Sequence, residues 1–397
     1  MRTTHFANGR KISTRIARKT TCPDDEDAQS AFDYAFLRER AFPVQSDGAP
    51  IIRTVDLFCG CGGLSLGAKE ACRALGKRFL PVVAVDKDPI SLKVYEHNFQ
   101  CRRTYTCDIS DILNGEIGSR PTNNEDHFLE EVNDVDLLLA GPPCQGYSDL
   151  NNRTRRNDPR NVLYERVARF VELARPRHVL IENVSTAIHG REGAVRRSLH
   201  VIRRLGYKVD SDVVNLVAIG VPQKRKRHVV IASISKTLSV REVVDKHRIK
   251  SERSVRWAIG DLRDEPSDGI FTTPSRHTRE NMRRIRYLHE KDRFDLPNWL
   301  RPACHRKGRH SYKSMYGRLR LDEPAQTITG GFGSPGQGRF VHPTKLRTLT
   351  PHEAARLQFF PDFFDFSLVQ KRTSLAEMIG NAAPMKLSYV ICLDLLA

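Results

Sequence analysis

Long apolar segments are missing from this 397-residue sequence. A membrane-spanning helix needs about 18 or more consecutive apolar residues. The richest stretches here, residues 135–140 and 229–234, have the length of a strand and are each interrupted by a polar residue. Apolar residues make up 39% of the chain and charged residues 28%, which is typical of a folded protein rather than a disordered one. At roughly 150 residues per domain, the length favours two to three domains.

A regular cysteine framework is also missing. The nine cysteines are scattered and odd in number, and no secretory signal precedes them, which predicts reduced thiols in a cytoplasmic protein. Cys59 and Cys61 lack a second ligand pair at a spacing that suits a metal, and Cys304, His305 and His310 have no better support. We therefore predict no metal site.

Acidic residues are absent from residues 1–21, which carry six Lys and Arg residues. Organelle transit peptides share this composition, but no cleavage signal separates the segment from the folded part. We predict that residues 1–50 form a flexible basic extension that helps to hold phosphate groups.

Negative charge is scarce in the chain as a whole, because 65 Lys and Arg against 47 Asp and Glu give a net charge of +18. Such an excess implies a polyanionic partner, and nucleic acid is favoured over membrane because no basic amphipathic helix with an apolar anchor face is evident. Residues 236–345 hold 24 basic and 13 acidic residues, hence +11 of this charge, in an irregular sequence with no strand–helix rhythm. We predict that this segment is a smaller inserted domain with a basic face.

From residue 51, short apolar runs alternate with helical patterns. This rhythm predicts a doubly wound, mostly parallel α/β domain of the Rossmann-like type over residues 51–235, to which residues 346–397 return. Ligands of such sheets bind beyond the carboxyl ends of the strands. The expected strands are residues 51–58, 82–85, 135–140, 179–181 and 229–234, and the expected helices are residues 64–75, 89–99, 163–175, 194–205, 350–359 and 374–396.

The first strand runs into a glycine-rich turn with the sequence DLFCGCGGLSLG, beginning at Asp56. Glycines at such a turn let a ligand approach the backbone closely. Ser65 stands where the dinucleotide fingerprint has its third glycine, which argues against a diphosphate. Asp86 ends the next strand and suits ribose hydroxyls, so the pair favours a nucleoside ligand, with a simple tight turn as the alternative.

A second motif, GPPCQGYS, follows another apolar strand and contains Cys144. Two prolines stiffen the chain before this cysteine, and Arg153, Arg155 and Arg156 favour its thiolate form. Glu182 ends the next strand and is expected at the same sheet edge. A thiol nucleophile and a carboxyl group facing a basic groove form a catalytic constellation, whereas an isolated cysteine is usually a small buried apolar residue.

With these motifs in this order, the sequence resembles the DNA cytosine-C5 methyltransferase family from about residue 51 to the last residue, with residues 1–50 outside the resemblance. The blocks that carry it are DLFCGCGG at Asp56, the acid Asp86, CDI at Cys107, GPPCQGYS at Gly141, ENV at Glu182, QKRKR at Gln223, TLTPHEAARLQ at Thr348 and GNAAP at Gly380.

The resemblance implies transfer of a methyl group from S-adenosylmethionine to C5 of a cytosine flipped out of duplex DNA. Cys144 would form a covalent bond to C6, and Glu182 would protonate or hydrogen-bond N3. Arg225 and Arg227 would hold the target base and the active-site loop, with Arg227 nearer to O2. The base that removes the C5 proton is left open.

The resemblance also implies a set of cofactor-binding residues. Phe58 would pack on adenine, and Asp86 would bind the ribose. One departure from the family is Ala383-Pro384, where many relatives carry a small residue and valine. The other implied residues are Gly60 and Gly62 at the methionine end, Asp108 and Ile109 at the adenine edge, Pro143, and Asn381 and Ala382, which would close the pocket.

Two other functions are alternatives to DNA methylation. Methylation of tRNA uses the same chemistry, but relatives that do this carry a Cys-Phe-Thr signature that is absent here. An inactive DNA-binding homologue is disfavoured because the catalytic residues implied by the resemblance are present. We therefore predict a monomeric, nucleoid-associated DNA methyltransferase of a restriction–modification system, with residues 236–345 as its target-recognition domain and a restriction endonuclease for the same site as its partner.

Overall fold

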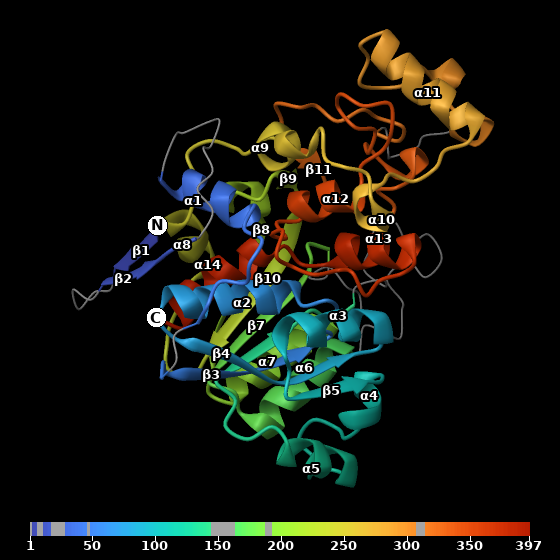
Figure 1. The fold of residues 1–397 in the computed structure, drawn as a ribbon. Coiled ribbons are helices and arrows are strands. Elements are labelled where there is room, and N and C mark those ends of the chain that lie inside the picture. Colours follow the sequence, from blue (N-terminus) through green and yellow to red (C-terminus); the bar gives the residue numbers. More distant parts are fainter. Residues whose placement is uncertain are drawn as a thin grey trace.

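The computed structural model describes residues 2–5, 11–16, 28–45, 48–143, 163–186, 193–306 and 314–397. Seven strands form a central sheet in the order β5-β4-β3-β6-β7-β10-β8 (Figure 1). The first five strands in this order are parallel, and β10 runs antiparallel to both of its neighbours. The predicted mostly parallel α/β fold is thus confirmed. The strands are β3 (Ile51–Leu57), β4 (Arg78–Asp86), β5 (Arg103–Thr106), β6 (Leu137–Ala140), β7 (His178–Val184), β8 (Lys208–Asn215) and β10 (Lys226–Ser233).

Helices cover both faces of the sheet and enclose one hydrophobic core on each side. Among the residues that the structure describes, no helix is both long and apolar enough to cross a membrane. The first core, called the core beneath α2, contains side chains of α2 (Gly63–Ala74), α3 (Pro89–Phe99) and α14 (Met385–Leu395). The second, called the core beneath α6, contains side chains of α4 (Ile109–Ile112), α5 (Asn123–Glu130), α6 (Leu163–Ala174) and α7 (Ala194–Arg204).

Successive residues of the central strands enter opposite cores. In β6, Leu137 and Leu139 belong to the core beneath α2, whereas Leu138 and Ala140 belong to the core beneath α6. Because both faces are buried, the strand is a continuous apolar run instead of an alternating one. These continuous apolar runs are the reason why the central strands could be predicted from the sequence.

The sequence analysis missed β5 and β8, which are the two edge strands of the sheet. β5 has the sequence RTYT, and most residues of β8 are only partly buried. A strand at an edge pairs on one side only, and these two carry no apolar run that would mark them as buried.

The predicted flexible extension is not what the structure shows for the described part of residues 1–50. β1 (Arg2–His5) pairs with β2 (Lys11–Thr14), and α1 (Ala28–Leu37) buries Phe32, Phe36 and Leu37 in the core beneath α2. The prediction was based on the basic charge of this segment. Transfer of its aromatic side chains from water into the core is nevertheless favourable, so α1 packs against the protein.

The predicted inserted domain also begins later than residue 236. α8 (Val240–Lys246) and α9 (Val255–Ile259) contribute buried side chains to the core beneath α2. A separate small core appears only farther along, formed by Ile285, Leu288, Leu296, Leu300, Tyr316 and Val341. It includes residues of α11 (Arg279–Glu290), which lies far from the sheet in Figure 1.

The rest of this segment is irregular. Among its described residues, the one strand is β11 (Ala325–Gln326), which pairs with β9 (Gln223–Lys224) beside the large domain. The short helices are η3 (Leu216–Ile219) before β9, and η4 (Gly260–Leu262), α10 (Gly269–Thr272), η5 (Asn298–Leu300), η6 (Ala303–His305) and η7 (Pro335–Gln337) within the segment.

The C-terminal segment returns to the large domain as three helices. α12 (Pro351–Leu357) lies where a helix was predicted, but the expected helix over residues 374–396 is two helices, α13 (Arg372–Asn381) and α14. Pro384 separates them, because proline has no backbone N–H and obstructs a continuing helix. The break creates the loop that includes Ala382 and Ala383.

The contact between α2 and α14 depends on a glycine. A Cβ atom added at Gly67 would lie 2.0 Å from the Met385 carbonyl oxygen and 2.1 Å from the Ser388 Oγ. Since part of this obstacle is backbone, we expect Gly67→Ala to destabilise the protein by about 3 kcal/mol, at the upper end of overpacking effects. Thermal unfolding followed by calorimetry measures the change.

Gly260→Ala is the matched control for this substitution. Gly260 has right-handed helical angles, and the nearest atom to an added Cβ is the Arg256 Cγ at 3.6 Å. We expect this variant to be as stable as the unaltered protein or more stable by about 0.4–1 kcal/mol. Equal melting temperatures for the two variants would contradict the role assigned to the α2–α14 contact.

Candidate active site

The predicted site residues that the structure describes gather largely at one edge of the sheet. Phe58, Asp86 and Glu182 stand at or just beyond the carboxyl ends of β3, β4 and β7. Because β10 runs in the opposite direction, its first residues, including Arg227, begin at this same edge. This is where doubly wound sheets bind ligands.

The turn after β3 is shaped by residues with left-handed backbone angles. Phe58 has a φ of 59°, Gly60 of 52° and Gly62 of 95°. A Cβ added at Gly62 would lie 2.2 Å from the Phe99 ring, so this glycine permits packing inside the protein. A Cβ at Gly60 would have no atom within 4 Å, so only Gly60 of this pair borders open space.

Asp86 braces this turn. Its Oδ2 accepts a hydrogen bond from the Gly60 N–H at 2.7 Å, and its Oδ1 accepts one from the Asp88 N–H at 2.8 Å. Burial raises the pKa of Asp86 above its ordinary value, and these backbone donors oppose the rise. The carboxyl group therefore links the glycine turn to the end of the neighbouring strand.

A buried hydrogen-bond chain supports the turn from behind. The Ser65 hydroxyl donates to Asp56 Oδ2 at 2.6 Å and lies 2.8 Å from the Tyr95 hydroxyl. Burial raises the pKa of Asp56 to about 8, which favours a neutral carboxyl group at pH 7. Ser65, noted in the sequence only for replacing a glycine, thus has a structural role that the sequence analysis missed.

Asp108 and Ile109 mark the start of α4. Asp108 Oδ1 accepts a hydrogen bond from the Ser110 N–H at 3.0 Å, and Oδ2 lies 3.3 Å from the Lys87 Nζ. The Ser110 bond is the main cause that lowers the pKa of Asp108. Ile109 is buried in the core beneath α6, so Asp108 presents the polar part of this pair.

Glu182 and Arg227 form an ion pair at the sheet edge, with 2.5 Å between Glu182 Oε1 and Arg227 Nε. Their side chains are only 11% and 13% exposed, so water screens the pair weakly. The next residue, Asn183, donates to the Pro142 carbonyl oxygen at 3.3 Å, which ties β7 to the turn that leads to Pro143 and Cys144. Glu182 is thus next in sequence to the residue that ties β7 to Pro142.

Cys144, Arg153, Arg155 and Arg156 lie outside the described residues, as do His310 and the side chain of Cys304. Pro143 is the last described residue before this gap and is half-buried. The predicted catalytic thiol therefore stays a prediction.

Arg225 does not point to the ion pair. Its guanidinium donates to the carbonyl oxygens of Ile328 at 2.8 Å, Gly380 at 3.3 Å and Ala382 at 3.4 Å. Ile328 belongs to the segment before α12, Gly380 to the last turn of α13, and Ala382 to the loop between α13 and α14. The buried Arg225 thus joins distant parts of the chain.

Two glutamines that the sequence analysis did not select complete this junction. Gln223 donates to Gln358 Oε1 at 2.6 Å, and Gln358 donates to the carbonyl oxygen of Ile379 at 2.7 Å. Ala382 is half-buried and Asn381 is exposed. Asn381 is the last residue of α13 and Ala382 follows it, so the end of this helix has carbonyl groups that are bonded from the interior.

Comparison with known proteins identifies this arrangement. A family model described as C-5 cytosine-specific DNA methylase matches residues 52–396. The chain belongs to this family. The predicted enzyme class, a DNA (cytosine-5) methyltransferase, is thereby confirmed.

Relatives of this methyltransferase support the assignment. It is 45% identical to the Type II methyltransferase M1.BsuMI of Bacillus subtilis. The alignment spans 387 residues and covers 97% of this chain and 90% of that protein. It is 30% identical to the Type II methylase M.HgiDII of Herpetosiphon aurantiacus, over 85% and 93% of the two chains. The crystal structure of the S. pombe Dnmt2 methyltransferase matches with a TM-score of 0.59 and 18% identity, over 86% of this chain and 98% of that one, and indicates a shared fold.

The contacts of Arg225 predict a loss of stability when its guanidinium is removed. Arg225→Met leaves three backbone carbonyl groups without this donor, so we expect a loss of about 2–4 kcal/mol in the free energy of unfolding. Denaturant unfolding of the full chain measures this loss.

Lys224→Met provides the control, because Lys224 is about half exposed and forms a surface ion pair with Glu323 at 3.3 Å. We expect it to cost less than about 1 kcal/mol. An Arg225→Met protein of unchanged stability but without activity would show instead that Arg225 acts on the substrate.

Proposed function

We propose that this enzyme transfers the methyl group of S-adenosylmethionine to C5 of a cytosine in duplex DNA through a covalent bond between Cys144 and C6. The observation that carries the proposal is the family match over residues 52–396, which spans every predicted motif. Glu182 lies near the carboxyl end of β7, at the sheet edge that also carries Asp86, which supports the proposal.

The chemistry follows from the weakness of C5 as a nucleophile in an aromatic ring. When the Cys144 thiolate adds to C6, the ring loses its aromaticity and C5 gains enamine character. Electron density moves toward N3, where Glu182 is proposed to donate a proton or a hydrogen bond. After C5 has been methylated, a base removes the C5 proton and the bond from C6 to Cys144 breaks, which regenerates the thiolate.

The residues of the glycine turn suit a nucleoside with an attached methyl donor. When bound, S-adenosylmethionine supplies an electrophilic methyl group on a sulfonium. Gly60 borders open space, and the Asp86 carboxyl group has lone pairs beyond those used by its two backbone donors. In our proposal Phe58, Gly62, Asp108, Ile109, Pro143, Asn381 and Ala382 complete this site.

Two considerations favour duplex DNA as the substrate, namely the net charge of the chain and the access that the reacting groups need to C5 and C6. The net charge of +18 favours a polyanion. C5 and C6 of a stacked cytosine cannot meet a thiol and a methyl donor together, so the base must leave the duplex. Because the relatives are named Type II methyltransferases, we also propose that a restriction endonuclease recognises the same site.

The substrate class is tested by methyl incorporation. We expect the purified enzyme to transfer labelled methyl groups from S-adenosylmethionine to duplex DNA, and bisulfite sequencing to find the modified cytosines in one sequence context. Efficient transfer to tRNA, with none to duplex DNA of varied sequence, would overturn the proposed substrate.

The nucleophile is tested by trapping. Duplex DNA with 5-fluorocytosine at the target should form a covalent complex that survives denaturing electrophoresis, because fluorine cannot leave C5 as a proton does. Cys144→Ala should abolish the complex, whereas Cys101→Ala, which changes a half-buried thiol elsewhere, should retain it. A complex that persists in Cys144→Ala would refute the assignment.

A further inference from the structure

Helix α1 lies before the part of the chain that the family model matches, yet it is built into the core. The family match begins at residue 52, whereas α1 ends at Leu37. The alignment with M1.BsuMI covers 97% of the chain, so it extends well into this N-terminal part. The helix is therefore not simply an added tail, and its contacts indicate what it does.

Asp33 of α1 neutralises two buried cations. Its Oδ2 lies 2.6 Å from Arg253 Nη2 and accepts a hydrogen bond from Lys386 Nζ at 2.7 Å. The three side chains are at most 5% exposed. Burial alone raises the pKa of Asp33, but the two cations lower it to about 2, so the group is a carboxylate. Within the described residues, no other carboxylate forms an ion pair with either cation.

Lys386 lies at the start of α14, directly after the loop of residues 382–384 that follows Asn381 of α13. The Ala383 carbonyl oxygen of this loop packs against the start of α2, where it would lie 2.3 Å from a Cβ added at Gly63. A shift of the first turn of α14 would therefore move the loop relative to the glycine turn that precedes α2.

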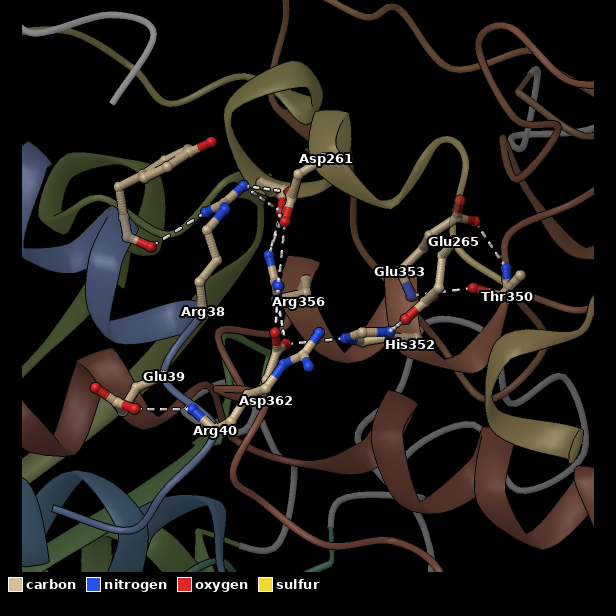
Figure 2. Close-up of polar contacts among 12 residues, drawn as sticks. Arg38, Glu39, Arg40, Asp261, Glu265, Thr350, His352, Glu353, Arg356 and Asp362 are labelled. Atoms are coloured by element: carbon tan, nitrogen blue, oxygen red, sulfur yellow. Dashed lines mark hydrogen bonds and ion pairs between the residues drawn. The ribbon is translucent and has the colours of Figure 1, made fainter. Parts of the chain in front are cut away.

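The far end of α1 is anchored separately. Arg38 donates to the Trp257 carbonyl oxygen at 3.0 Å. It also donates to Asp261 Oδ1 at 2.5 Å (Figure 2). Asp261 lies 3.4 Å from Arg356 of α12, which in turn binds Asp362 at 2.6 Å.

His352 extends this network. It lies between Asp362, at 2.9 Å, and Glu265, at 2.7 Å (Figure 2). The contacts of Arg38 restrict the movement of α1. The position of the Asp33 carboxylate is therefore restricted as well.

We propose that α1 is a positioning element of the methyl-donor site, and that Asp33 holds the first turn of α14, and hence the loop from Ala382 to Pro384 that follows Asn381, in its binding position. The inference rests on the proposed function in one respect, namely that this loop closes the S-adenosylmethionine pocket. Asp33 touches no proposed ligand and acts through Lys386.

Asp33→Asn in the full-length enzyme tests the proposal, because it keeps the size of the side chain and leaves two cations without their carboxylate. We expect the dissociation constant for S-adenosylmethionine, measured by calorimetry well below the melting temperature, to rise about tenfold, within the range that remote mutations produce through packed networks. Adding Lys386→Met removes one of the unpaired charges, and we expect it to restore most of the affinity.

Asp394→Asn is the matched control. Asp394 lies near the other end of α14, where it lies 2.8 Å from His247 and forms a second ion pair with Lys246. We expect this variant to melt at a lower temperature and to bind S-adenosylmethionine as tightly as the unaltered enzyme.

Three results would decide against the proposal. An Asp33→Asn protein that melts earlier but binds S-adenosylmethionine normally would show that Asp33 only stabilises the fold. Equal loss of affinity in Asp33→Asn and Asp394→Asn would show a general effect of destabilisation. If Asp33→Asn does not fold, Asp33→Glu replaces it, with a rise of about threefold expected and unchanged affinity as the refuting result.

Binding of S-adenosylmethionine to the unaltered enzyme separates a failure of the proposed function from a failure of the role of α1. If the unaltered enzyme does not bind S-adenosylmethionine, the proposed function is wrong and this inference is overturned with it. If the unaltered enzyme binds and Asp33→Asn binds equally well, only the role of α1 is overturned.

Discussion

The near contact between the backbones of α2 and α14 is the constraint on which the rest of the site depends. Ser388 of α14 donates to the Leu64 carbonyl oxygen at 2.8 Å, and Gly67 leaves no room for even a methyl group between the helices. One helix begins at the glycine turn and the other begins after the loop of Asn381. Their separation therefore sets the distance between the two sides of the predicted pocket.

Two arginines near this junction make different contacts although they are close in the sequence. Arg225 directs its guanidinium to backbone carbonyl groups of three segments, whereas Arg227, two residues later, pairs with Glu182 at the open edge. The family resemblance grouped them as holders of the base and loop. In the structure, Arg225 holds segments of the protein together, and Arg227 contacts another predicted site residue, Glu182.

The sequence predicted the sheet and the site best where burial or motif constrains the residues strongly. Central strands such as β6 are apolar on both faces, Asp86 ends β4 as expected, and Glu182 lies two residues before the end of β7. Asp33, by contrast, could not be selected, because its partners Arg253 and Lys386 are 220 and 353 positions away, and no local pattern records such a pairing. The structure does not describe Cys144, so this central prediction depends on the trapping experiment.

The α2–α14 contact also has a consequence for biosynthesis. The Ser388–Leu64 bond joins residues 324 positions apart, so at about 5–20 residues per second a ribosome makes the second partner roughly 16–65 seconds after the first. During that interval the glycine face of α2 lacks its cover, and the nascent chain exposes apolar surface that chaperones bind. Until α14 has been made, α2 and the glycine turn before it lack this partner, even when the whole central sheet has been synthesised.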